Sequence, residues 1–243
     1  MADAAGDILR KTYRQPITVD LKSDTSPVTQ ADREVESAMR NLIEAHYPEH
    51  GIVGEEFGNI RPGSPFQWVL DPIDGTRSFI GGYPLFTTLI SLVHEGIPVL
   101  GIIYQPISGE RWLGLTAQNT TLNKKAVTTR ATQDLAASVL ATTSIDYFTA
   151  EQTDIFKELR KQCANTILGG DAYAYAMLAS GHIDIVVDAG LKTYDFCALK
   201  PVIEGAGGII TDWKGAPLTL ASDGRVLAAA NSTLHKAALA QLR

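Results

Sequence analysis

The chain has 243 residues, with 45% apolar and 20% charged side chains and a formal net charge of −6. This balance is typical of a globular protein, and an acidic chain without a basic block is a poor partner for nucleic acid. No apolar run reaches the roughly 18 residues that a membrane span needs, and no signal peptide is visible. The two separated cysteines, Cys163 and Cys197, favour a reducing cytoplasm.

The first half of the chain predicts helices followed by an antiparallel sheet. Helices are expected at 2–14 and 31–46, where apolar residues recur at helical spacing. An apolar strand at 66–70 is expected to stop at Pro72, because proline fixes φ and has no N–H to donate. Apolar runs separated by turn residues predict three antiparallel strands, at 85–94, 99–105 and 111–115.

The second half alternates strands with helices, which predicts α/β construction. The expected strands are 139–142, 166–168, 183–187, 209–211 and 226–229. The expected helices are 150–162, 171–180, 195–206 and 232–242. The change of character divides the chain into an N-terminal α+β subdomain, 1–120, with most candidate metal ligands, and a C-terminal α/β subdomain, 121–243, within one compact unit.

The segment Asp71-Pro-Ile73-Asp74-Gly75-Thr76 is the strongest indication of a site. A turn here lets both carboxylates and the Ile73 carbonyl face one point, and such oxygens suit a hard cation such as Mg²⁺. Without a cation, two carboxylates this close repel each other and one protonates. Gly75 lets the backbone approach a phosphate, and free N–H groups at a helix start bind anions. Taken alone, the segment favours an ordinary turn.

Three further acidic positions have a structural explanation as well as a functional one. Glu55, beside Glu56, is a residue of a solvated loop or a metal ligand. Asp195 is a helix N-terminal carboxylate or a ligand, and Asp32, three residues after Thr29, is a capping residue or a water-activating acid. Together with the central segment, they have the composition of a metal cluster with an acid that activates water.

These motifs resemble the inositol monophosphatase superfamily over nearly the whole chain and in family order. The resemblance is carried by Gly54-Glu55-Glu56, Trp68–Thr76, Tyr194-Asp195 and Glu204–Gly208. Other segments are similar to its histidinol-phosphatase branch, namely Ser26–Glu36, Thr76–Ile80, Gln105–Trp112, Gly169–Tyr173 and Pro201–Trp213. The resemblance implies a layered α-β-α-β-α sugar-phosphatase fold, a homodimer and inhibition by lithium.

The resemblance also implies two or three Mg²⁺ ions in one active site, with Mn²⁺ as an alternative. Glu55, Asp71 and the Ile73 carbonyl would hold the first ion. Asp71, Asp74 and Asp195 would hold the second. A third, looser ion would depend on Glu55, which is therefore expected to take part in catalysis.

The remaining implied roles concern water and phosphate. Asp32 and Thr76 would orient and deprotonate the attacking water. The N–H groups of Gly75 and Thr76, together with Lys22, would bind the phosphate. No residue is needed as a nucleophile, because a two-metal site generates hydroxide and stabilises the leaving alkoxide.

The predicted substrate is a small phosphorylated alcohol, with histidinol phosphate preferred. Its ammonium and imidazole groups require carboxylates beyond the metal ligands, and Asp171 and Asp188 are the candidates. Tyr173 is a candidate to stack on the imidazole, and Arg77 and Asp74 are expected to contact the substrate. Asp171 fits a helix N-terminus equally well, and Tyr173 fits a core position slightly better.

Several alternatives remain open at this point. Thr193, where the branch commonly has proline, and Asp188, where it often has glutamate, depart from the branch pattern and bear on substrate geometry. The same chemistry suits inositol monophosphate or a nucleotide bisphosphate. A glycosidase would need two carboxylates and no metal. A metal-binding protein that has lost catalysis is the last alternative.

Overall fold

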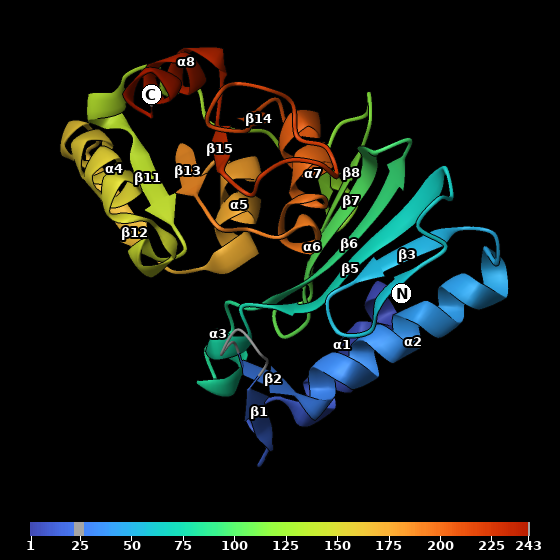
Figure 1. Ribbon diagram of the computed structural model, residues 1–243. Coiled ribbons are helices and arrows are strands. Elements are labelled where there is room, and N and C mark those ends of the chain that lie inside the picture. Colours follow the sequence, from blue (N-terminus) through green and yellow to red (C-terminus); the bar gives the residue numbers. More distant parts are fainter. Residues whose placement is uncertain (22–26, 243) are drawn as a thin grey trace.

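Figure 1 shows the computed structural model of the chain, which describes residues 1–21 and 27–242. Over these residues the chain forms five layers: helices, an eight-stranded sheet, helices, a five-stranded sheet, and helices again. The α-β-α-β-α fold predicted from the sequence is therefore confirmed. No helix in the described ranges is long and apolar enough to cross a membrane.

The first sheet has the strand order β10-β9-β8-β7-β6-β5-β3-β4. These strands are β3 (Gly51–Gly54), β4 (Gly58–Ile60), β5 (Phe66–Asp74), β6 (Thr87–His94), β7 (Ile97–Gln105), β8 (Glu110–Leu115), β9 (Thr121–Leu122) and β10 (Lys125–Ala126). All neighbours pair antiparallel except β3 and β5, which are parallel. The sheet thus runs to Ala126, beyond the subdomain boundary expected after residue 120.

Helices α1 (Ala2–Thr12) and α2 (Gln30–His46) cover one face of the first sheet. Two short strands, β1 (Val19–Leu21) and β2 (Pro27–Thr29), pair antiparallel beside the N-terminal end of α2. Helix α3 (Thr76–Ile80) follows β5 directly and contacts β2. The elements that carry Asp32, Asp71 and Thr76, namely α2, β5 and α3, therefore lie close together.

Strand β5 does not stop at Pro72, and the prediction that it ends there is wrong. The strand continues to Asp74, and its register against β6 shifts, because Asp71 pairs with Leu89 while Asp74 pairs with Thr87. One extra residue on β5 forms a bulge, a common way for a strand to accept a proline. The hydroxyl of Thr88 donates to the Pro72 carbonyl at 2.9 Å.

The second sheet has the order β12-β11-β13-β15-β14. Its strands are β11 (Val139–Thr142), β12 (Asn165–Leu168), β13 (Ile185–Asp188), β14 (Ile209–Thr211) and β15 (Val226–Ala229). The middle layer, between the two sheets, contains α5 (Asp171–Ala179), α6 (Thr193–Phe196) and α7 (Leu199–Gly205). The outer layer contains α4 (Ala150–Gln162) and α8 (Ser232–Gln241). Two 3-10 helices are η1 (Leu135–Ala137) and η2 (Ile145–Tyr147).

The helix expected at 195–206 is divided into α6 and α7. Pro201 explains the division, because it has no N–H to donate to the carbonyl of Cys197 four residues earlier. The backbone of Cys197 and Ala198 keeps helical angles, so the chain turns little between the two segments.

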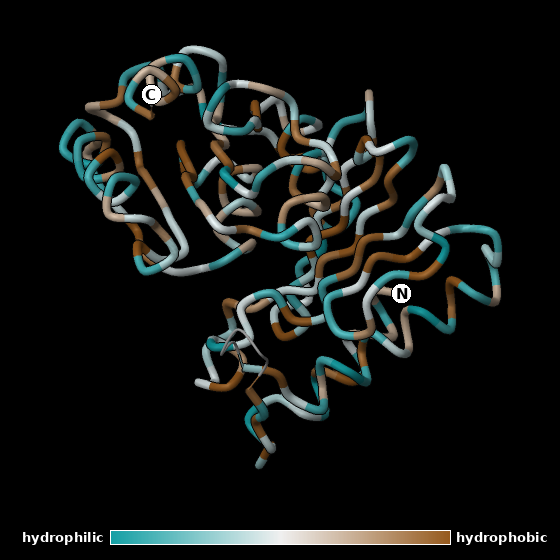
Figure 2. The backbone as a smooth tube through the Cα atoms, viewed as in Figure 1, coloured by the Kyte–Doolittle hydropathy of each residue, from teal (hydrophilic) through white to brown (hydrophobic). Residues whose placement is uncertain are grey.

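Three apolar clusters fill the spaces between the layers. Met39 and Phe86 belong to the cluster between α1, α2 and the first sheet. Trp112 and Tyr175 belong to the cluster between the sheets, and Phe156 belongs to the outer one. Figure 2 shows the corresponding hydrophobic stretches along the strands of the first sheet.

Two glycines allow the middle layer to lie close against the first sheet. A Cβ atom at Gly101 would lie 2.0 Å from the carbonyl oxygen of Ala198, and one at Gly114 would lie 2.4 Å from the backbone of Pro201. Both distances are impossible for real Cβ atoms, so any side chain here would push α7 away. This close packing fixes the position of the neighbouring α6, which carries Asp195.

Candidate active site

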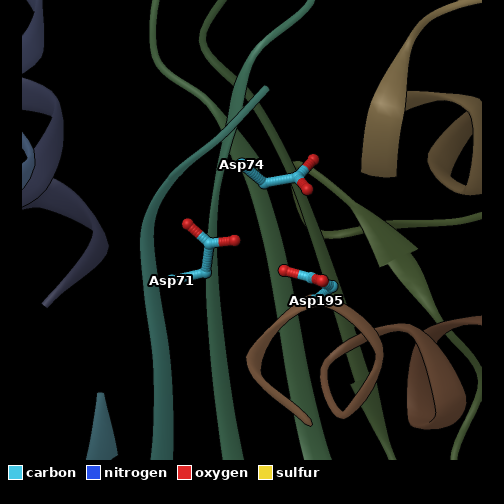
Figure 3. A group of neighbouring side chains, drawn as sticks. All are labelled: Asp71, Asp74 and Asp195. Atoms are coloured by element: carbon cyan, nitrogen blue, oxygen red, sulfur yellow. The ribbon is translucent and has the colours of Figure 1, made fainter. Parts of the chain in front are cut away.

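Three aspartates from two elements converge in the structure. Asp71 and Asp74 lie on β5, and Asp195 lies on α6, which packs against β5. Each offers a carboxylate oxygen within 4.8 Å of the others, and Figure 3 shows the three side chains pointing toward one another. In a regular strand, residues three apart point to opposite faces, so the bulge at Pro72 is what brings Asp71 and Asp74 to the same side.

Without a cation, it is energetically unfavourable for all three buried carboxyl groups to be ionised. Burial, followed by the charges of Glu55, Asp74 and Asp195, raises the pKa of Asp71 well above its usual range. Burial and then the charge of Asp171 raise the pKa of Asp74 well above its usual range. Burial above all raises the pKa of Asp195 to about 7, with a smaller raising effect from the charge of Glu55.

The donor set fits a hard divalent cation. Asp71 Oδ1 is buried and has no hydrogen-bond partner among the described residues, which is unusual for a buried oxygen. The atoms that face the cluster are carboxylate oxygens, the ligands that Mg²⁺ and related ions prefer. The buried acidic cluster can therefore bind a metal ion.

A buried glutamate holds the loop that carries Glu55. The Glu36 carboxylate on α2 accepts the backbone N–H of Glu56 at 2.7 Å and of Phe57 at 3.1 Å, and it pairs with Arg40 at 2.8 Å. A Cβ atom at Gly54 would lie 2.1 Å from Glu36 Oε1. The glycine and the buried carboxylate together place Glu55 at the pocket, where its charge acts on Asp71.

Asp32 has the capping role that its sequence position suggested, and it also lies beside Thr76. Its Oδ2 accepts the N–H of Thr29 at 2.7 Å and the Thr29 hydroxyl at 2.6 Å, which forms the capping box of α2. Its Oδ1 lies 3.5 Å from Thr76 Oγ1. The same Thr76 hydroxyl lies 3.0 Å from the Ile73 carbonyl oxygen, so Asp32, Thr76 and Ile73 form one polar chain beside the cluster.

Gly75 begins α3 with a backbone that a side chain would disfavour. Its φ is +81°, in the left-handed region, and a Cβ atom would lie 2.6 Å from Asp171 Oδ2. The first N–H groups of a helix have no partner within the helix and attract anions. Gly75 and Thr76 line the pocket, as expected for a phosphate-binding turn.

The pocket around the cluster brings together most of the predicted site residues. Its charged lining residues are Glu55, Asp71, Asp74, Asp195, Asp171, Arg77 and Lys192. Asp74 also accepts the N–H of Ala172 at 2.6 Å, which ties β5 to the start of α5. Lys22, a predicted phosphate ligand, lies outside the described residues.

Two predicted substrate residues do not face the pocket. Tyr173 donates from its hydroxyl to Glu110 at 2.9 Å and packs edge-on against Trp112, so it faces β8, and the predicted stacking role has no support in its position. Burial raises its pKa to about 12. Tyr173 is half-buried and packs against the apolar cluster between the sheets.

Asp188 is the second such residue. It is 2% exposed, and its carboxylate accepts Thr142 Oγ1 at 2.8 Å, the N–H of Thr143 at 2.7 Å and the Tyr175 hydroxyl at 2.8 Å. Burial raises the pKa of Asp188 to about 6. The carboxylate ties β11 to β13 and α5, and it does not line the pocket, which corrects the role predicted from the resemblance.

The sequence did not point to Tyr147, Thr143 or Lys192, which also line the pocket. The N–H of Lys192 donates to Asp195 Oδ2 at 2.6 Å, so its spacing of three residues from Asp195 was the one available signal. Tyr147 and Thr143 follow β11 in a segment without a repeating pattern. Their place depends on how the two sheets meet.

Comparison with known proteins identifies the family of this chain. The family model described as "Inositol monophosphatase family" matches residues 1–243. The chain belongs to the inositol monophosphatase family. Family membership makes it a phosphoric monoester hydrolase and confirms the phosphatase chemistry predicted from the motifs.

Three relatives illustrate the family likeness. "Bifunctional phosphatase IMPL2, chloroplastic" from Arabidopsis thaliana is 45% identical over 100% of this chain and 72% of its own length. A histidinol-phosphatase from Chlorobaculum parvum is 33% identical over 100% of this chain and 93% of its own. A solved inositol monophosphatase from Zymomonas mobilis is 51% identical, with a TM-score of 0.92, over 99% of this chain and 94% of that one.

Proposed function

We propose that this phosphatase is Mg²⁺-dependent and hydrolyses histidinol phosphate to histidinol and phosphate. The observation that supports the metal dependence most directly is the convergence of Asp71, Asp74 and Asp195, in which the buried Asp71 Oδ1 has no hydrogen-bond partner among the described residues. The substrate is supported by relatives named as histidinol-phosphatases, which match the whole chain at 30% to 33% identity.

The proposed metal ligands are those that the family resemblance implies. Glu55, Asp71 and the Ile73 carbonyl would hold one ion, and Asp71, Asp74 and Asp195 would hold another, with a third beside Glu55. When bound, such ions lower the pKa of water and counter the charge on a leaving oxygen. Mg²⁺ suits these oxygen ligands, and Mn²⁺ is the alternative.

The protein's own groups would complete the reaction. Asp32 and Thr76 would orient the attacking water and accept its proton, through the polar contacts that they make beside the cluster. The new bond joins the water oxygen to phosphorus, the bond to the alcohol oxygen breaks, and the alcohol leaves with a proton. The N–H groups of Gly75 and Thr76 would counter the charge on the phosphoryl oxygens.

The second candidate substrate is inositol 1-phosphate, because the Zymomonas mobilis structure with 51% identity is described as an inositol monophosphatase. Steady-state phosphate release with histidinol phosphate, inositol 1-phosphate and adenosine 3′,5′-bisphosphate tests the choice. We expect the highest kcat/KM for histidinol phosphate. Equal or lower efficiency on it would overturn the substrate proposal and leave the phosphatase assignment in place.

The metal proposal has its own test. Exhaustive EDTA treatment is expected to abolish turnover, and added Mg²⁺ is expected to restore it. Phosphate release that survives chelation would contradict the metal mechanism. Inhibition by lithium, implied by the family resemblance, is measured in the same assay.

We further propose a homodimer in a reducing cytoplasm. Ile167 and Leu168 on the edge strand β12 are 42% and 53% exposed, and exposed apolar residues on an edge strand favour association. The proposed compartment rests on the sequence, in which Cys163 and Cys197 are the only two cysteines and lie far apart. Sedimentation equilibrium of the purified protein tests the dimer, and a monomer at all concentrations would contradict it.

A further inference from the structure

A half-exposed aromatic ring lies at the pocket without an assigned role. Tyr147, the last residue of η2, is 49% exposed and lines the same pocket as Asp71 and Asp195. The guanidinium carbon of Arg77, on α3, lies 5.9 Å from the centre of the Tyr147 ring. Tyrosine offers a flat apolar face with a polar tip, so a ring left open in a polar pocket is available to stack on a ligand.

Asp171 lies in the same part of the pocket. Its φ is +44°, and it follows Gly169 and Gly170, whose φ values of +93° and +102° are also left-handed. Aspartate is one of the few side chains that tolerate this region, and such strain is concentrated at functional sites. The turn folds the Asp171 carboxylate over Gly75, at the start of α3.

Arg77 and Asp171 also influence the pKa of Tyr147, as expected for side chains that lie close together. Burial raises the pKa of Tyr147, Arg77 lowers it, and the charge of Asp171 raises it again to a smaller extent. Burial raises the pKa of Asp171, and Arg77 opposes that shift. The three side chains therefore share one environment, contributed by α3, η2 and α5.

Asp171 is the acidic group of this pocket that the proposed metal ions leave unused. Five carboxylates line the described pocket, and four of them, Glu55, Asp71, Asp74 and Asp195, are proposed metal ligands. Asp188 cannot replace Asp171, because its oxygens are engaged by Thr142, Thr143 and Tyr175. A substrate with a positive charge next to its phosphate group would give Asp171 a second cationic neighbour besides Arg77.

We propose that Tyr147 and Asp171 determine specificity for the alcohol portion of the substrate. The planar ring of the alcohol stacks on Tyr147, its ammonium group pairs with Asp171, and Arg77 restrains the Tyr147 ring. The ligand class is the phosphate monoester of an amino alcohol that carries a flat ring. This inference rests on the proposed function. It adds Tyr147 to the residues that contact the alcohol, and it assigns the ammonium group to Asp171, which was one of two candidates.

The test compares three phosphate monoesters. Histidinol phosphate has a ring and an ammonium group, phosphoethanolamine has only the ammonium group, and inositol 1-phosphate has neither. Tyr147→Leu is expected to lower the kcat/KM ratio of histidinol phosphate to phosphoethanolamine about 3- to 10-fold, mainly through KM, because a stacked ring pair is worth about that much. Tyr147→Phe keeps the ring and is expected to restore most of this ratio.

Asp171→Asn is the second variant, chosen because asparagine also tolerates a left-handed backbone. It is expected to lower the kcat/KM ratio of phosphoethanolamine to inositol 1-phosphate about tenfold, as a lost charged contact would. Tyr47→Leu removes another half-exposed tyrosine, 48% exposed beside Trp68 and away from the pocket, and is expected to change neither ratio. Thermal unfolding of each variant shows whether it is folded.

The outcomes separate this inference from the proposed function. A wild-type enzyme that prefers inositol 1-phosphate overturns the proposed substrate, and with it this inference. A wild-type enzyme that prefers histidinol phosphate, together with Tyr147→Leu or Asp171→Asn losses that are equal on all three substrates, overturns the inference alone. A loss in Tyr147→Phe as large as in Tyr147→Leu would also contradict the stacking role.

Discussion

Asp71 occupies a position that folded proteins usually give to an apolar side chain. It is 2% exposed, lies in a strand among buried residues and still faces other carboxylates. Burial and neighbouring charge raise the pKa values of Asp71, Asp74 and Asp195, so the metal-free cluster retains protons that an exposed aspartate would release. The stability of the metal-free protein must then depend on pH.

The metal-free protein is expected to lose stability as pH rises from about 4 to about 7. The pKa of Asp195 is about 7 in the folded protein against an ordinary value of 3.8. Between these values the folded state binds more protons than the unfolded state, so raising the pH favours unfolding, and the loss is complete above the folded pKa. We expect Tm in EDTA to fall on the order of 5 °C between about pH 5 and pH 8. Thermal scans measure it.

Two control measurements test whether the ionised carboxylates cause this fall in Tm. Saturating Mg²⁺ compensates the ionised carboxylates, so the gap in Tm between Mg²⁺ and EDTA should widen as pH rises. Asp71→Asn removes one group with a raised pKa, so its Tm in EDTA at pH 8 should exceed that of the wild type, while its turnover is lost. A gap in Tm that does not change with pH would contradict the explanation.

At the scale of elements, the geometry of the site depends on the bulge in β5 and on a buried side chain of α2. The bulge in β5 turns Asp71 and Asp74 to one face, and α2 presents the buried Glu36 to the loop after β3. The bulge is made of proposed metal ligands and their neighbours, whereas Glu36 lies behind the loop and contacts its backbone. Both set the positions of the proposed metal ligands.

Glu36→Ala is expected to raise the Mg²⁺ concentration for half-maximal activity about tenfold, as loss of a group that orients a metal ligand typically does. The variant leaves the N–H groups of Glu56 and Phe57 and the guanidinium of Arg40 without this acceptor. Glu34→Ala, on an exposed position of the same helix, is the matched control. A lower Tm with an unchanged Mg²⁺ dependence would show that Glu36 stabilises the fold without positioning Glu55.

Much of this arrangement could be predicted from the sequence, and the exceptions have physical reasons. Strand 139–142 and helix 150–162 lie where apolar patterning placed them, because local pattern and burial agree there. The bulge at Pro72 was missed, because the strand register is decided by the partner β6. Tyr147 was missed, because its place in the pocket depends on the packing of two sheets and leaves no local signal.

At the scale of the whole molecule, the middle layer joins the two sheets. Helix α7 contacts β7 and β8 of the first sheet and β14 of the second, and α5 contacts β7 and β13. The apolar cluster around Trp112 and Tyr175 includes buried residues from both sheets. The two halves of the chain therefore share one core, as well as one site.

Because of the shared core, the described part of the chain is expected to unfold in a single transition in Mg²⁺. Trp68 reports on the first sheet and Trp213 on the outer cluster of the second. In variants in which Trp112 and one of these two tryptophans are replaced by phenylalanine, the urea midpoint from fluorescence should coincide with the midpoint from far-ultraviolet circular dichroism. Two separate midpoints within one variant would show that the halves unfold independently.

The division of the proposed ligands between β5 and α6 also orders events during synthesis. Asp71 and Asp74 leave the ribosome long before Asp195, which lies in the C-terminal half. A nascent chain that has completed only the first sheet has its buried carboxylates without the second element that closes the cluster. Tight metal binding by the whole cluster would then become possible only after the C-terminal half has been synthesised and folded.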